Sequence, residues 1–135
     1  MTAAHCNVYG VIMGIDWGAR RIGIAVSESG SIATPHSVLR NEGDVAEKLA
    51  ELARQLDAET IVLGVARDGQ KFHDLAERLR QKTCKPVVLW DEELSTVEAA
   101  EHLRAGGKRR REAQREIDMH AAAVILQSYL DRRES

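Results

Sequence analysis

Residues 11–26, with the sequence VIMGIDWGARRIGIAV, decide how this chain begins to fold. The stretch from Val11 to Asp16 is apolar up to its last residue, which is typical of a buried strand. Residues 17–20 contain a glycine and form a tight turn, and apolar residues alternate from Arg21 to Val26 as in a second strand. Because the turn is short, we expect the two strands to pair antiparallel.

The remaining segments can be assigned from their apolar spacing. A third strand is predicted over 31–39, interrupted or edged by Pro35, which has no N–H for a central ladder. From Gly43 the spacing becomes helical, with Asp44 placed to cap the helix. The later predictions are a strand at 60–65, a helix at 70–82, a strand at 86–90, a helix from Ser95 to about Leu103 and a last helix from about Arg115 to Leu130.

This order of elements predicts an α/β fold. Three meandering antiparallel strands followed by two parallel strands give a single mixed five-stranded sheet flanked by helices. Right-handed crossovers put the parallel strands side by side, with their carboxyl ends at one edge, where ligands of open sheets bind. We expect one domain over 1–135, with residues 1–8 as a tail.

Composition narrows the function classes. The hydrophobic fraction is 44%, the charged fraction 30% and the formal net charge −2, as in ordinary globular proteins. No apolar run reaches the roughly 18 residues of a membrane span, and the first residues do not resemble a signal peptide, so we expect a cytoplasmic protein. One Phe, two Tyr and two Trp are few for a protein that binds single strands by base stacking.

Acidic residues stand at three informative places. Asp16 ends an apolar strand, where a carboxylate needs partners; a turn-forming Asp bonded to its own backbone is an equal alternative. Residues 91–93 are three acids after the last strand, and at least one of them is expected to be solvated. Asp118 borders an apolar helix face, which disfavours an unpaired acid; the alternative is a first-turn Asp stabilised by the helix dipole.

Converging carboxylates suit Mg²⁺ or Mn²⁺, which prefer oxygen ligands. Such ions can activate a water and stabilise the leaving oxygen in phosphoryl transfer. The five histidines and two cysteines are scattered and suggest no zinc site. The acids therefore favour a metal-dependent nuclease.

Three motifs resemble the YqgF/RuvX family. Residues 14–25 (GIDWGARRIGIA) are similar to its opening GIDxGxxRIGxA, and residues 91–99 (DEELSTVEA) to its DERLSTVEA segment. Residues 117–130 (IDMHAAAVILQSYL) resemble its closing IDxxAAxxILQxYL helix. The matches follow in order over almost the whole chain.

The resemblance implies an RNase H-like fold, related to Holliday junction resolvases, and a nuclease that processes the 5′ end of precursor 16S rRNA. The family's acidic centre falls on Asp16, Glu92 and Asp118, as catalytic residues and as ligands of Mg²⁺ or Mn²⁺. Asp91 is a second-choice ligand. The implied partners are nucleic acid, RNA in preference to DNA, and a pre-ribosomal particle; monomer and homodimer both stay open.

The chain departs from the family pattern at two points. Glu93 stands where the family usually has Arg. The segment 64–69 (GVARDG) is shorter than the family's GLPxxxDG loop and lacks its Pro. Because that loop borders the expected site, substrate choice is left open.

Basic residues near these acids are candidates for binding the nucleic-acid backbone. We expect a flexible cationic loop to contact it, formed by Lys108, Arg109, Arg110 and Arg111, although charge runs are usually solvated. Arg20 and Arg67 are further candidates, with a plain surface role as the alternative for Arg67. Arg21, at the start of a strand, is expected to pack or pair.

Three other functions are compatible with the sequence. One is a resolvase-type endonuclease acting on Holliday junction DNA. Another is a non-catalytic nucleic-acid-binding module whose acids are structural. The third is an actin-like ATPase, which clamps nucleotide between two lobes, whereas 135 residues supply one.

Overall fold

The computed structural model describes residues 10–65, 70–91 and 110–134. Within them the strands are β1 (Val11–Asp16), β2 (Arg21–Ser27), β3 (Thr34–Arg40), β4 (Ala58–Val65) and β5 (Val87–Asp91). The helices are α2 (Val45–Leu56), α3 (Gln70–Thr83) and α5 (Arg110–Glu134). The helix expected from Ser95 lies outside the described residues.

The described strands form one mixed sheet in the order β3-β2-β1-β4-β5. β1 pairs antiparallel with β2 and parallel with β4, and β5 extends the parallel part. The predicted fold class is therefore confirmed. The parallel strands β1, β4 and β5 end at the same edge of the sheet, as expected from right-handed crossovers.

β3 begins at Thr34, later than the predicted residue 31. The backbone N–H groups of Ser31 and Ile32 are instead bonded to Ser29 Oγ, and that of Ala33 to Gln127 Oε1 on α5. These side-chain acceptors replace the ladder that a longer strand would need. Pro35 lies in an edge strand, as predicted.

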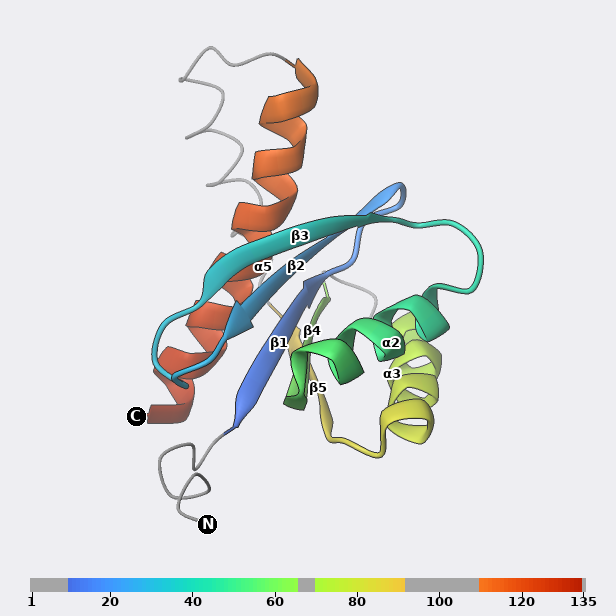
Figure 1. Cartoon of the computed structure of the whole chain (residues 1–135), viewed down its shortest axis with the longest axis vertical. Helices are drawn as coiled ribbons and strands as arrows, with labels where there is room; N and C mark the ends of the chain where they lie inside the picture. Colours follow the sequence, from blue (N-terminus) through green and yellow to red (C-terminus); the bar gives the residue numbers. More distant parts are fainter. Residues whose placement is uncertain (1–9, 66–69, 92–109, 135) are drawn as a thin grey trace.

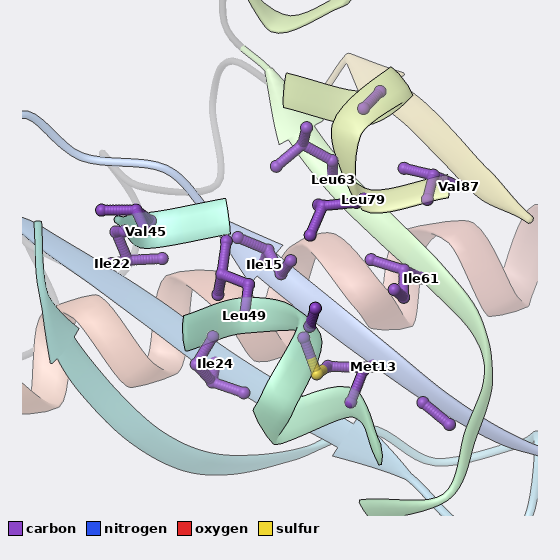
Figure 2. Packing of buried hydrophobic residues seen from close by; sticks show 14 residues of the cluster. Met13, Ile15, Ile22, Ile24, Val45, Leu49, Ile61, Leu63, Leu79 and Val87 are labelled. Atoms are coloured by element: carbon purple, nitrogen blue, oxygen red, sulfur yellow. The ribbon is translucent and has the colours of Figure 1, made fainter. Parts of the chain in front are cut away.

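Helices cover both faces of the sheet (Figure 1). Met13 and Ile15 of β1 face α2 and α3, where Leu49 and Leu79 complete a buried cluster (Figure 2). The alternate residue Ile12 faces α5 in a second cluster. The sheet is thus buried on both sides, which explains why its central strands are apolar almost throughout.

The helix boundaries correct one prediction. Asp44 caps α2 as expected, accepting a hydrogen bond from the backbone N–H of Glu47. α5, however, begins at Arg110, so Arg110 and Arg111 belong to a helix and the predicted loop is wrong for both. Arg, Glu, Ala and Gln are strong helix formers, but the first turns of α5 lack the apolar periodicity that signals a helix.

Within the described residues, we find no helix that combines the length and the apolarity needed to cross a lipid bilayer.

Candidate active site

The site is built around Asp16, the last residue of β1. Asp16 lies opposite Gly23 of β2 and Gly64 of β4. Side chains alternate along a strand, so Asp16 shares the α5 face with Ile12. Since both neighbours across the ladder are glycines, no side chain from either position covers the carboxyl group.

Glycines also let α5 approach the sheet closely enough to bring a second acid to this face. A Cβ atom added at Gly23 would lie 2.0 Å from the carbonyl oxygen of Asp118, and one added at Gly14 would lie 2.8 Å from Leu126 Cβ. The backbone of α5 therefore rests almost directly on β2 at Asp118. Because Gly23 is the ladder partner of Asp16, the two aspartates become neighbours.

Asp118 is held by Arg21, the first residue of β2. Arg21 Nε donates a hydrogen bond to Asp118 Oδ2 at 2.8 Å. The side chain of Asp118 is 15% exposed and that of Arg21 41% exposed, so the pair lies at the rim of the site. The prediction that Arg21 packs or pairs is confirmed, and its partner is now identified. Asp118 lies in the third turn of α5, so the first-turn alternative is wrong.

Asp16 carries an electrostatic cost in the folded protein. Burial, and secondarily the charge of Asp118, raise the pKa of Asp16 from 3.8 to about 7. Among the described residues, none forms a hydrogen bond or ion pair with the Asp16 carboxylate. The alternative that Asp16 is a turn residue hydrogen-bonded to its own backbone is therefore wrong for the described residues. A partly buried carboxylate without a partner is unfavourable unless a cation compensates it.

The donor set fits a hard divalent cation. Two carboxylates converge, and Mg²⁺ is typically held by one or two carboxylates together with waters and substrate phosphate. The described residues contain no group of three or more His, Cys, Asp or Glu side chains arranged to hold a metal ion. The expected third ligand, Glu92, lies outside the described residues.

The end of β5 lies at the same edge of the sheet. β5 runs parallel to β4, and the backbone of Asp91 pairs with Val65, directly after Gly64. β4 in turn separates β5 from β1, so neighbouring-strand spacing puts the end of β5 about 10 Å across the sheet from Asp16. The side chains of Asp91 and Glu92 lie outside the described residues, so the convergence expected for them stays a prediction.

The predicted basic contacts are only partly described. Arg20 is exposed in the turn between β1 and β2. Arg67, Lys108 and Arg109 lie outside the described residues, as do the side chains of Arg110 and Arg111. The phosphate contacts assigned to these residues therefore stay predictions.

Two features of the site were not predicted. One is the pairing of Arg21 with Asp118; the other is the glycine-mediated approach of α5. A signal for the second was present, because Gly14 and Gly23 fall on one face of the predicted hairpin. Small residues on one face of a sheet indicate close approach by another backbone.

The chain is similar to known proteins in sequence and in fold. A family model described as "RuvX: Holliday junction resolvase" matches residues 10–132. A Mycobacterium bovis (strain BCG / Pasteur 1173P2) protein, whose name gives pre-16S rRNA nuclease as its provisional function, is 41% identical over 96% of this chain and 84% of its own.

Two solved structures have a similar fold. T. thermophilus RuvC in complex with a Holliday junction substrate has a TM-score of 0.57 and 17% identity, over 93% of this chain and 96% of that one. Fowlpox virus resolvase with junction DNA has a TM-score of 0.62 and 7% identity, over 93% and 99%. These neighbours identify a resolvase-like, RNase H-like fold, and the family match together with the mycobacterial relative shows that the chain belongs to the RuvX (YqgF) family.

Proposed function

We propose that this protein is a divalent-metal-dependent nuclease that hydrolyses phosphodiester bonds, with Asp16, Glu92 and Asp118 as its catalytic carboxylates. The observation that carries the proposal is that two acids, Asp16 and Asp118, lie side by side on the α5 face of the sheet. One of them, Asp16, has no hydrogen-bond or ion-pair partner among the described residues. A fold stabilised by burial does not gain from such a carboxylate, whereas a cation site requires it.

The residues would divide the work as follows. Asp16 and Asp118 would hold Mg²⁺ or Mn²⁺ with Glu92 as the third ligand and Asp91 as a second choice. The cation would supply the charge that activates a water and stabilises the leaving oxygen. Arg21 keeps the Asp118 carboxylate in a fixed orientation through its Nε contact. In the hydrolysis, water oxygen bonds to phosphorus while the bond to one sugar oxygen breaks, and that oxygen leaves with a proton.

The substrate we propose is the 5′ region of precursor 16S rRNA. The mycobacterial relative carries this activity in its name, and its similarity extends over almost the whole chain. RNA processing in the cytoplasm, in contact with a pre-ribosomal particle, is the corresponding cellular role. Lys108, Arg109, Arg110 and Arg111, with Arg20 and Arg67, are proposed contacts to the RNA backbone.

Holliday junction DNA is the second candidate substrate. The description of the family model and the junction-bound structural neighbours favour it. Two symmetric cuts would require two copies of the site, and hence a homodimer.

The test is cleavage of an end-labelled precursor 16S rRNA fragment and of a four-way DNA junction, in Mg²⁺, in Mn²⁺ and in EDTA. We expect the wild type to cut only with metal. Asp16→Asn should lower the rate about a hundredfold or more, since a metal centre supplies several kcal/mol of charge stabilisation. Asp74→Asn, the same change at an exposed position of α3, should cut like the wild type.

Cleavage by Asp16→Asn at the wild-type rate would contradict the assignment of the site. RNA binding that persists in EDTA, without cleavage in any metal, would instead support a non-catalytic binding module. Preference between the two labelled substrates decides between RNA processing and junction resolution.

A further inference from the structure

Arg21 has an unusual partner across the sheet. In the antiparallel ladder between β2 and β3, Arg21 lies directly opposite Arg40. Directly opposed residues on neighbouring strands share a face, and like charges in this relation are destabilising. The two arginines therefore concentrate positive charge at one ladder position, where Asp118 contacts one of them and Glu42 the other.

The two arginines lie at the same edge of the sheet as the acidic site. β2 runs antiparallel to β1, so Arg21 comes two positions before Gly23, the partner of Asp16. Two strand positions are about 7 Å, which puts Arg21 just beyond the end of β1 on the α5 face. Arg40 is the last residue of β3 and lies beside Arg21.

Both guanidinium groups retain donors for a ligand. Arg21 uses Nε for Asp118, and within the described part of the chain its two terminal nitrogens bond to no acceptor. The Arg40 side chain is 80% exposed, and its contact with Glu42 is long, at 3.6 Å between Nη1 and Oε2. An exposed pair of this kind contributes little and is easily exchanged for a better anion.

The backbone that carries this pair is firmly held. Asn41, next to Arg40, donates its side-chain amide to the carbonyl of Gly18 at 2.8 Å, and its backbone N–H to the carbonyl of Arg20 at 2.9 Å. These bonds tie the end of β3 to the turn that follows Asp16. The backbone positions of Arg21 and Arg40 are thus held close to the end of β1, which carries Asp16.

We propose that Arg21 and Arg40 form a phosphate clamp for the nucleic-acid strand that enters the acidic site. Guanidinium groups bind phosphate oxygens through paired N–H donors, and the Asp118 contact orients the Arg21 group for this purpose. The ligand is a phosphodiester of the substrate backbone, so the inference rests on the proposed function for the nature of its ligand. It adds two residues, on β2 and β3, to the substrate-binding surface.

Binding is measured separately from cleavage. Fluorescence anisotropy of a labelled single-stranded RNA, titrated in EDTA over a range of KCl concentrations, reports affinity and its salt dependence without metal or turnover. We expect Arg21→Gln and Arg40→Gln to raise Kd about tenfold each. The double variant should also lower the slope of log Kd against log salt by about 0.7 for each phosphate that the protein no longer neutralises. Arg21→Lys, which keeps the charge and removes the fork, should be intermediate.

The control is Arg54→Gln, the same change on α2, where Arg54 pairs with Glu47 and Glu51 away from the site. It should bind RNA like the wild type. Circular dichroism of each variant checks folding, and we expect Arg40→Gln to fold normally because the Arg40 side chain is largely exposed.

Wild-type affinity and salt slope in the double variant would overturn the clamp. So would a lower kcat for Arg21→Gln at unchanged KM and Kd, because Arg21 would then only position Asp118. If the wild type cleaves but the variants bind normally, the clamp fails and the nuclease stands. If the variants bind weakly but no protein cleaves, the clamp stands and the nuclease fails.

Discussion

At the scale of single residues, the candidate site contains a carboxylate, Asp16, that does not favour folding but suits metal binding. Asp16 is partly buried beside Asp118, and its pKa is raised to about 7 by burial first and by the neighbouring acid second. Arg21 neutralises Asp118 but not Asp16. Without a cation, ionised Asp16 therefore destabilises the folded state.

Replacing Asp16 by Asn should stabilise the metal-free protein, in a pH-dependent way. The folded pKa lies above the unfolded one, so the protonated form stabilises the fold at low pH, and this stability is lost as pH rises from about 4 to about 7. The slope is on the order of 1 kcal/mol per pH unit for one group. At pH 8 in EDTA, urea unfolding should find Asp16→Asn more stable than the wild type, with the gap closing by about pH 4.

Asp74→Asn is the control, because Asp74 is exposed on α3. Its stability relative to the wild type should not depend on pH. An equal, pH-independent difference for both variants would contradict the role of burial at Asp16.

At the scale of elements, the packing of α5 on the sheet determines the site. Within the described residues, the sequence predicted the strands and helices, because apolar periodicity and Asp44 capping are local signals. It placed the start of α5 too late, at about Arg115, because the first turns of that helix have no apolar face. It also did not predict the depth of packing, which depends on glycines in separate strands.

Gly23→Ala should be the more damaging of two matched glycine changes. The new Cβ would lie 2.0 Å from the Asp118 carbonyl oxygen. Because that atom belongs to the backbone of α5, the clash can be relieved only by moving the helix away from the sheet. We expect a loss of about 3 kcal/mol in unfolding free energy, with reduced nuclease activity. At Gly64 the nearest atom is Ile125 Cδ1, at 2.6 Å, the flexible end of a side chain. Gly64→Ala should therefore cost about 1 kcal/mol; equal costs in urea unfolding would refute this account of α5.

At the scale of the whole molecule, the proposed metal site joins two elements that are far apart in the sequence. Asp16 belongs to β1 and Asp118 to α5, which packs against one face of the sheet (Figure 1). A ligand that binds only when these elements are together stabilises the entire fold.

Mg²⁺ or Mn²⁺ should accordingly raise the melting temperature. At a metal concentration about ten times Kd, the gain is about 1.4 kcal/mol, or a few degrees for a chain of this size. Differential scanning calorimetry should find the rise in the wild type and not in Asp118→Asn, with KCl at matched ionic strength as the control. A rise of the same size in Asp118→Asn would argue for binding elsewhere.

The sequence alone determined the element types, the mixed character of the sheet and the acids to suspect, because these depend on local periodicity, short connections and motif spacing. The tertiary structure alone decided which side chains meet. Three contacts illustrate this: the bond between Arg21 and Asp118, the close packing of α5 on Gly14 and Gly23, and the pairing of Arg21 with Arg40 in the ladder. Each of them joins residues from different helices or strands. Such contacts depend on strand register and on how closely two backbones can pack, and neither quantity is encoded by any one stretch of residues.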